Sequence, residues 1–357
     1  MIQLVPNIQI LYSQLREQVQ NQQPNYKNWY LSEKVIAGNT YLYLSCKIGT
    51  TLINTSLGRS TPELSQRWQA VIAQKSADSA GSESARLVRA LEAAGAYTPS
   101  ALEAKVLTLL HQTELFQRGA ILIGTHAYAQ YQNMLGILYP STASSTARTK
   151  DMDILARPAA ITVVAPTLGE TLQDPKHQAR PVPQLNLKSP STDFTFYNNQ
   201  LTLQFLTPSG LSDAYQTKAL PQLGVHATAL PHLGYLMQQA VPTAIVCAAG
   251  IPATIPHPAR FAVHKLALST FPDRPPDKAS KDIAQSLQLL EYFQQWDQPA
   301  LDFALEQAAA DPALWSSVRR GFDRARQYNK ELIIAVLNAA PGALNLDKPV
   351  RAKSRRR

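Results

Sequence analysis

The chain has 357 residues, of which 45% are hydrophobic and 17% are charged. This composition is ordinary for a globular protein and excludes wholesale disorder, and the length allows a sizeable core divided among two or three domains. The formal net charge is +9, but residues 348–357 contain six basic and no acidic side chains. The rest of the chain is therefore only mildly basic, and its charge by itself does not indicate a nucleic-acid-binding protein.

Two cysteines, Cys46 and Cys247, stand far apart without a histidine or cysteine companion at metal-binding spacing. A disulfide framework or a zinc site is therefore not expected, and a reducing cytoplasm fits the sequence. The first residues lack a basic segment followed by a long apolar run, so no secretory signal is predicted. The most apolar stretch, 240–255, is broken by prolines and a glycine and is too short for a bilayer, so we expect a cytoplasmic protein without a membrane anchor.

Residues 1–115 are predicted to form an N-terminal region of helices and a small β-sheet. Helical spacing of apolar residues predicts an amphipathic helix over 1–22, on Ile8, Leu11, Leu15 and Val19. Three β-rich segments between 29 and 55, separated by glycine-containing turns, predict an antiparallel meander. Helix returns over 61–115 with a polar interruption at 76–84. We expect this region to pack on the core or to bind a partner, with its aromatic residues serving packing more than base stacking.

Residues 116–258 are predicted to be a core of mixed strands with one early helix, which indicates an α+β fold. The expected elements are a strand at 119–124, a helix at 126–136, strands at 151–156 and 161–165, a proline-rich loop at 166–191, a hairpin at 193–206, and a second strand pair near 226–229 and 243–248. Residues 259–340 are predicted to form a C-terminal helical bundle, and 341–357 a basic tail.

The most informative pattern is a strand that ends in Gly124-Thr125, followed by a helix and then by Asp151-Met-Asp153 on the next strand. A glycine and a small hydroxyl residue at a strand-to-helix junction offer backbone N–H groups and the positive end of a helix to phosphate oxygens. Carboxylates two residues apart on a strand share one face, where they can hold a divalent metal against a triphosphate. The pair therefore favours nucleotidyl transfer over a solvated strand with outward acids.

This order of motifs resembles the polymerase-β-like nucleotidyltransferase superfamily. Further segments between about residues 100 and 290, such as Leu206-Thr-Pro208 and Pro256-His-Pro-Ala-Arg-Phe-Ala-Val-His-Lys-Leu266, look like a bacterial branch of uncharacterised proteins with this fold. The resemblance implies that Asp151 and Asp153 bind Mg²⁺ or Mn²⁺, and that Gly124 and Thr125 bind the phosphates of a nucleoside triphosphate such as ATP. Other signatures, including a GxxxxGK[ST] phosphate loop and a GxGxxG fingerprint, are missing, which lowers the expectation of a kinase or dehydrogenase.

The superfamily commonly supplies a third carboxylate from a later strand, but the matching place here carries Gln204. An amide cannot act as an anionic metal ligand or as a base, so catalytic competence depends on a substitute. If Asn198-Asn199 is a two-residue turn, Asp193 lies directly opposite Gln204 on the same face of the hairpin. Asp193 is therefore a candidate for the displaced third catalytic carboxylate, and a turn of different parity would move it to the other face.

Basic residues cluster in the predicted helices beyond Pro258. By resemblance, the positions of Lys265 and of Lys281-Asp282 match basic motifs that face the active-site cleft in related proteins. Lys265 is expected to contact the triphosphate, and Asp282 to orient Lys281 or Arg274 through a charge-assisted bond. An ordinary solvated helix face with salt bridges is the alternative. His126 is expected to make a structural hydrogen bond at the start of its helix rather than to touch phosphate.

The sequence thus predicts a metal-dependent enzyme that moves a nucleoside monophosphate from a nucleoside triphosphate to an acceptor hydroxyl. The 3′ end of an RNA such as tRNA suits the basic tail as acceptor, and resemblance to toxin and antitoxin nucleotidyltransferases allows a protein side chain instead. The rival interpretation is a catalytically silent module that keeps the fold to bind nucleotide, RNA or a protein partner, with Gln204 as its mark.

Removal of residues 348–357 tests the role of the basic tail. If the tail contacts RNA, the shortened chain should bind RNA more weakly, and the slope of log affinity against log salt concentration should fall by about 0.7 for each phosphate that the tail neutralises. Titration of both proteins with labelled RNA at several salt concentrations measures this. Unchanged affinity would leave the tail as a solubilising segment.

Overall fold

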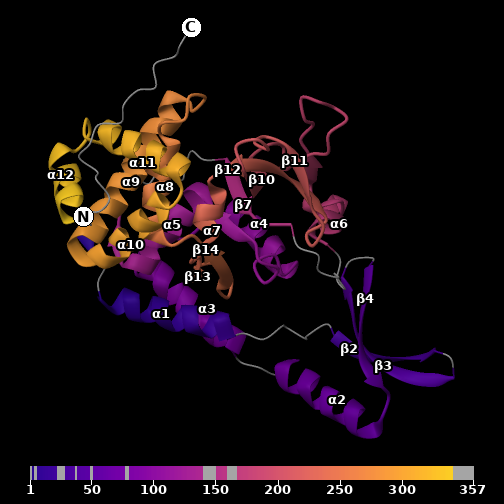
Figure 1. Cartoon of the computed structure of the whole chain (residues 1–357). Coiled ribbons are helices and arrows are strands. Elements are labelled where there is room, and N and C mark those ends of the chain that lie inside the picture. The colour runs from indigo at the N-terminus through magenta and orange to yellow at the C-terminus, as the bar shows by residue number, and fades with distance from the viewer. Residues whose placement is uncertain are drawn as a thin grey trace.

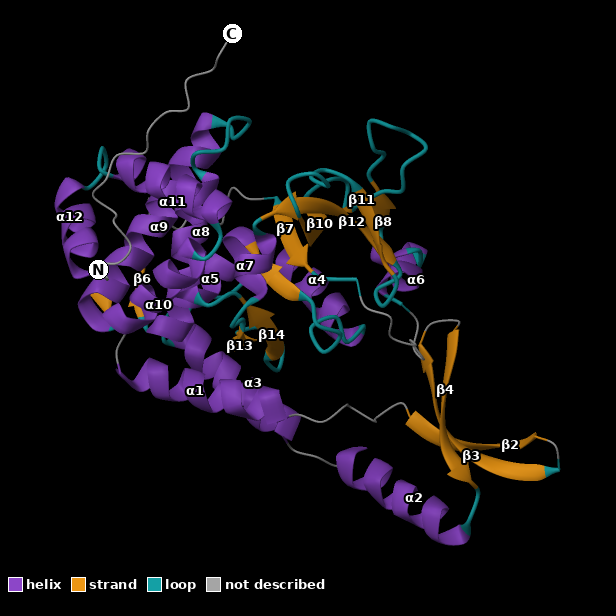
Figure 2. Cartoon of the chain, viewed as in Figure 1, coloured by secondary structure: helices purple, strands orange, loops and turns teal. Residues whose placement is uncertain are grey.

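The computed structural model describes residues 2–3, 6–21, 29–36, 38–48, 51–76, 80–139, 150–158 and 167–340. The fold is α+β, as predicted: an N-terminal helix and three-stranded meander, a mixed central sheet, and a set of C-terminal helices (Figures 1 and 2). The strand predicted at 161–165 and the basic tail lie outside the described residues. None of the described helices has the length and apolar character needed to cross a lipid bilayer.

The first long helix, α1 (Pro6–Asn21), lies beside α3 (Ala80–Ala93). Its buried stripe consists of Ile8, Tyr12, Leu15 and Val19. Leu11 was predicted in this stripe but is only half-buried, and Tyr12 is buried instead. The Tyr12 hydroxyl shares a 2.6 Å hydrogen bond with Thr243 Oγ1, more than 200 residues later. This helix is therefore part of the same body as the central strands.

The predicted meander is present as β2 (Trp29–Ile36), β3 (Asn39–Ile48) and β4 (Thr51–Arg59), with β3 antiparallel to both neighbours. It is followed by α2 (Pro62–Ser76), which packs against β2. In Figure 1 these four elements stand apart from the rest of the chain. The meander thus has its own small structure rather than a place in the central sheet.

The central sheet runs in the order β11 (Thr217–Leu220), β12 (Val225–Pro231), β10 (Leu201–Ser209), β7 (Asp151–Leu155) and β5 (Ile121–Ile123). Strand β10 is parallel to β7 and to β12, whereas β5 is antiparallel to β7. Strand β9 (Asp193–Phe196) pairs antiparallel with the first half of β10, and β8 (Ala179–Pro181) pairs with β9. Alternate residues of β10 are buried, as expected for a strand with one face on the core.

The second strand pair was predicted wrongly. Strand β12 joins the central sheet between β10 and β11, and the later segment forms β13 (Val241–Ile245), which pairs with β14 (Ile251–Ile255) instead. The chain reverses between these two strands through positive φ angles at Ala248 (53°) and Gly250 (83°). Because the turn is local, this hairpin forms at a lower cost in chain entropy than a pairing with the distant β12.

The proline-rich stretch 166–191 was expected to be a loop, but it contains the short helix α6 (Leu168–Leu172) and strand β8. A capping box starts α6: the Thr167 hydroxyl accepts from the Glu170 backbone N–H, and the Glu170 carboxylate accepts from the Thr167 backbone N–H. This Thr-x-x-Glu pattern is a known sequence signal for the start of a helix, although the surrounding prolines favoured a loop.

The helices α8 (Pro258–Leu268), α9 (Pro276–Trp296), α10 (Gln298–Ala309), α11 (Pro312–Ala325) and α12 (Lys330–Ala339) form the C-terminal part (Figure 1). Proline occupies one of the first two positions in each of the first four, where its missing N–H costs nothing. Buried side chains of these helices belong to the same hydrophobic cluster as those of the central sheet. The helices are therefore held firmly against the sheet, and α8 and α9 close over its β7 side.

Candidate functional site

The junction between β5 and α5 (Gly124–Leu135) brings the helix N-terminus against strand β7. Gly124 has φ 66°, a conformation that L side chains rarely adopt. A Cβ built there would lie 2.0 Å from Asp153 Oδ2. No side chain caps the first turn of α5, and Thr125 is its second residue. The glycine therefore lets a carboxylate approach a helix N-terminus whose N–H groups face the same space.

Strand β7 alternates as predicted between apolar and acidic residues. Met152 and Ile154 are completely buried in the core, whereas Asp151 and Asp153 are partly exposed on the opposite face. Both carboxylates line a cleft of about 900 Å³ together with Gly124 and Thr125. The structure thus brings the two predicted motifs to one surface.

Burial raises the pKa of Asp153 above its ordinary value, and the nearby charge of Asp151 adds to the rise. Positive charge from His126, Lys265 and Lys278 acts in the opposite direction. A carboxylate that is costly to ionise gains more from a bound cation than an exposed one does. The environment of the pair is therefore suited to a cationic ligand.

His126 makes the structural contact that the sequence predicted. Its Nε2 lies 3.0 Å from Glu103 Oε1, and its side chain is almost fully buried. Glu103 also closes the capping box of α4 (Ala101–Gln112) by accepting from the Ser100 backbone N–H. This contact ties the first turn of α5 to the preceding helix.

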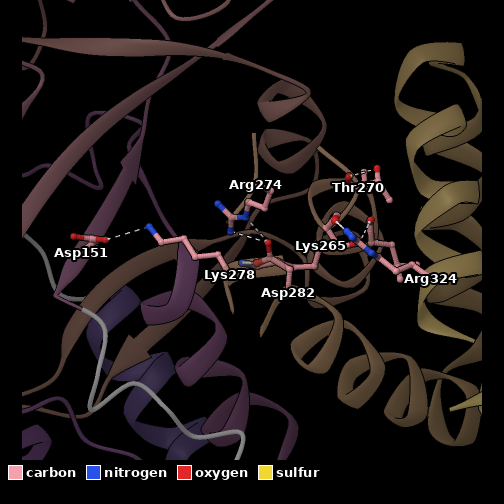
Figure 3. A network of polar contacts seen from close by, with 10 residues as sticks. Asp151, Lys265, Thr270, Arg274, Lys278, Asp282 and Arg324 are labelled. Atoms are coloured by element: carbon pink, nitrogen blue, oxygen red, sulfur yellow. Dashed lines mark hydrogen bonds and ion pairs between the residues drawn. The ribbon is translucent and has the colours of Figure 1, made fainter. Parts of the chain in front are cut away.

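The other wall of the cleft comes from α8, α9 and the loop between them (Figure 3). It carries four cationic side chains and three aspartates: Lys265, Arg274, Lys278, Lys281, Asp273, Asp277 and Asp282. Lys265 Nζ lies 2.6 Å from Asp282 Oδ1, and the Arg274 guanidinium donates to Asp282 Oδ2 at 2.7 Å. Lys278 Nζ reaches across the cleft to within 3.8 Å of Asp151 Oδ2. The buried Asp282 therefore holds two cations at the cleft, and a third faces the carboxylate pair.

Sequence reasoning found part of this wall. It placed Lys265 at the site and paired Asp282 with either Lys281 or Arg274, of which the structure shows Arg274. It did not foresee the Lys265–Asp282 ion pair or the contact between Lys278 and Asp151. Lys281 also lines the cleft, where burial, reinforced by the charge of Lys265, lowers its pKa. The i, i+3 spacing of Lys278 and Lys281 on one helix face was the available signal.

The hairpin keeps the predicted register although its turn is longer than expected. Phe196 pairs with Leu201, and Tyr197, Asn198 and Asn199 all have positive φ. Because four loop residues replace two, the parity is unchanged and Asp193 still pairs with Gln204.

Gln204 in turn pairs with Asp153, so the three side chains form a row across β7, β10 and β9. The Gln204 amide donates to Asp193 Oδ2 at 3.2 Å. Burial raises the pKa of Asp193, and the charge of Asp151 acts in the same direction. Two strand spacings, about 10 Å, separate Asp193 from Asp153. Gln204 and Leu206 of β10 are among the described residues that line the cleft, and Asp193 is not.

A family model described as Nucleotidyltransferase matches residues 102–310, which is more than half of the chain. The chain belongs to this nucleotidyltransferase family. Comparison with curated proteins and with solved structures gives no match. The matched region extends from α4 to α10 and includes all the residues that line the cleft. Membership of this family implies a nucleoside triphosphate substrate.

The donor set of this nucleotidyltransferase site fits a hard divalent cation completed by substrate. Mg²⁺ binds through one or two carboxylates plus phosphate oxygens and water rather than through an all-protein cage. Asp151 and Asp153 supply such a pair, and no group of three or more potential ligands (His, Cys, Asp, Glu) occurs among the described residues. The two carboxylates would therefore hold a metal only together with the phosphates of a nucleotide.

His264 lines the cleft with its Nε2 buried and without a hydrogen-bond partner in the described residues. Burial lowers its pKa to about 3, with further contributions from Lys265, His232 and Arg274. Between about pH 6.5 and pH 3 the imidazole is therefore largely neutral in the folded protein but protonated in the unfolded chain.

This pKa predicts a loss of stability in acid. Below about pH 6.5 the unfolded chain binds a proton at His264 that the folded state refuses, so the free energy of unfolding should fall by up to ~1.4 kcal/mol per pH unit until about pH 3. Chemical denaturation across this range should show a shallower decline in His264→Gln than in the wild type. His226→Gln is the control, and equal slopes in the wild type and His264→Gln would contradict the assignment.

Proposed function

We propose that this protein transfers a nucleoside monophosphate from a nucleoside triphosphate to an acceptor hydroxyl and releases pyrophosphate. The observation that carries the proposal is the meeting of Asp151 and Asp153 with the N-terminus of α5 in a cleft whose opposite wall supplies lysine and arginine side chains. Negative charge for a metal and positive charge for phosphates thus face each other across one space. This is the arrangement that phosphoryl transfer requires, since its catalysis is mainly positioning and charge stabilisation.

Asp151 and Asp153 would hold Mg²⁺ or Mn²⁺ in the proposed enzyme. When bound, such a metal polarises the transferred phosphoryl group and lowers the pKa of the attacking hydroxyl. Lys278 lies at 3.8 Å from Asp151, a loose contact that leaves room for a change of partner. Lys278 would therefore turn from the carboxylate to a phosphate oxygen when the nucleotide enters.

Gly124, Thr125 and Lys265 would bind the triphosphate. Backbone N–H groups at the start of α5 offer donors, and Lys265 offers a cation that Asp282 holds in place. A lysine that is almost fully buried needs such a partner, because its charge has little access to water. Asp282 is thus a positioning residue that holds Lys265 and Arg274 at the cleft.

During transfer the acceptor oxygen bonds to the α-phosphorus while the bond from that phosphorus to the bridging oxygen breaks. The acceptor proton must leave to a base, and we propose Asp193 for this third-carboxylate role, since its raised pKa brings it nearer to working pH. The acceptor itself is either an RNA hydroxyl, such as a tRNA 3′ end, or a hydroxyl of a protein side chain.

One observation favours a second candidate function. Gln204 stands between Asp153 and Asp193, where the superfamily pattern expects a carboxylate. A chain without a third carboxylate in reach would bind nucleotide without transferring it, and would act as a nucleotide-, RNA- or protein-binding module.

Label transfer distinguishes the two candidates. We expect the wild type, incubated with each α-³²P nucleoside triphosphate, magnesium or manganese and cell extract, to label a macromolecule. Asp151→Asn/Asp153→Asn should lose at least about 100-fold in rate, because several kcal/mol of charge stabilisation depend on the bound metal. Asp323→Asn on the exposed surface of α11 is the control, and nuclease or protease treatment of the labelled band identifies the acceptor. Equal labelling by the wild type and the double variant would refute the enzyme.

Asp193→Asn tests the displaced carboxylate in the same assay. If Asp193 takes the proton, the rate should fall by at least about 100-fold, the lower end of what a positioned base contributes. The wild-type rate should decline in acid as Asp193 protonates, at a higher pH than an ordinary aspartate would give, because its pKa is raised. The acid limb should change in the variant, because what remains of it then belongs to Asp153, whose pKa is raised as well. A variant with the wild-type rate and the same acid limb would show that transfer proceeds without Asp193.

A further inference from the structure

The ladder of the meander assigns a set of polar and aromatic residues to one face of its sheet. Ser32 of β2 pairs with Tyr43 of β3, and Lys34 pairs with Tyr41. On the other side of β3, Tyr41 pairs with Arg59 of β4. Directly paired residues lie on the same side of a sheet, and residues two apart along a strand do so as well. The face that we call the meander face therefore contains Tyr30, Ser32, Lys34, Tyr41, Tyr43, Ser45, Ser56 and Arg59.

The two faces of the meander differ in character. Leu42 and Leu44 lie on the opposite face and are buried, with exposed fractions of 2% and 5%. On the meander face Lys34 and Arg59 are exposed, and Tyr30 keeps 46% of its surface in water. The meander face thus presents Tyr30, Lys34 and Arg59 to solvent, with Tyr41 and Tyr43 half-buried and Ser45 fully buried between them. Exposed aliphatic side chains occur on both faces, Ile36 on the meander face and Val35 on the other.

The centre of the meander face combines serines with tyrosines. Small serines lie between the rings, and the hydroxyls of Ser32 and Ser45 are hydrogen-bonded at 2.5 Å. Lys34 Nζ sits 4.8 Å from the centroid of the Tyr43 ring, so the cation rests on an aromatic surface. Tyr41 and Tyr43 are about 7 Å apart along β3, which leaves room for a separate base on each ring.

The charge of this part of the chain favours a polyanion. Residues 29–76 contain five lysines and arginines against two acidic residues. A sheet whose open face carries aromatic rings stacks unpaired bases, while neighbouring cations attract the phosphates. The exposed Ser56 and the tyrosine hydroxyls add partners for a ribose 2′-hydroxyl.

We propose that the meander face binds single-stranded RNA. Bases stack on Tyr30, Tyr41 and Tyr43, and Lys34 and Arg59 contact the backbone. The proposal does not depend on the chemistry of the cleft, because the residues of the meander face are separate from those that line it.

The test uses the full chain and a fluorescent single-stranded RNA longer than the about 16 nucleotides that one small binding module covers. Anisotropy titrations at several salt concentrations give affinity and salt slope. Tyr41→Leu/Tyr43→Leu should bind at least about fivefold more weakly, since each ring loses its stacked base. Lys34→Gln/Arg59→Gln should lower the salt slope by about 1.4, the value for two phosphates of a single strand that are no longer neutralised.

Arg326→Gln/Lys330→Gln is the matched control, because it removes the same charge from the helical part of the chain. It should keep the wild-type affinity and slope, and an unchanged unfolding midpoint should accompany both meander variants. Several results would overturn the proposal: no RNA binding by the wild type, wild-type affinity in Tyr41→Leu/Tyr43→Leu, or equal or tighter binding of the same sequence as DNA or duplex. A wild-type dimer that the tyrosine variant loses, without RNA binding, would assign the face to a second copy instead.

Discussion

The close approach of Gly124 to Asp153 is the constraint on which the candidate site depends. Strand β5 pairs with β7 so that Ile123 faces Asp153, and the chain must then turn at once into α5. A Cβ there would lie 2.0 Å from the carboxylate, so a larger residue would force the Asp153 side chain to move. The positive φ of the same residue excludes most other side chains independently. One glycine thus joins the acidic strand to the N-terminus of α5.

The cations on the opposite side of the cleft balance the negative charge of Asp151 and Asp153. Carboxylates from the sheet and cations from α8 and α9 face each other across the cleft. The ion pair with Asp282 offsets the desolvation free energy of the buried Lys265 ammonium group. The network in Figure 3 therefore links the helical part of the chain to the acidic strand. A ligand that carries both negative phosphates and a bound metal is complementary to both walls.

The row of Asp153, Gln204 and Asp193 is where the two candidate functions part. The amide of Gln204 cannot bind a metal as an anion, yet it donates a hydrogen bond that fixes the carboxylate behind it. The row thus carries a hydrogen bond between Gln204 and Asp193 and is interrupted in charge at Gln204. An enzyme would have to take its third carboxylate from Asp193 on β9, one strand beyond Gln204 on β10. A binding module does not need a third carboxylate.

The sequence by itself determined the features that depend on local periodicity. Alternation along β7 placed Asp151 and Asp153 on one face, and the even number of loop residues kept Asp193 opposite Gln204 although the turn length was wrong. The pairing of β13 with β14, the partner of Lys265 and the reach of Lys278 to Asp151 were decided only by tertiary structure. The distance and angle of α8 and α9 relative to the sheet are set by their packing against the shared core. The spacing of residues along the sequence does not reveal this geometry.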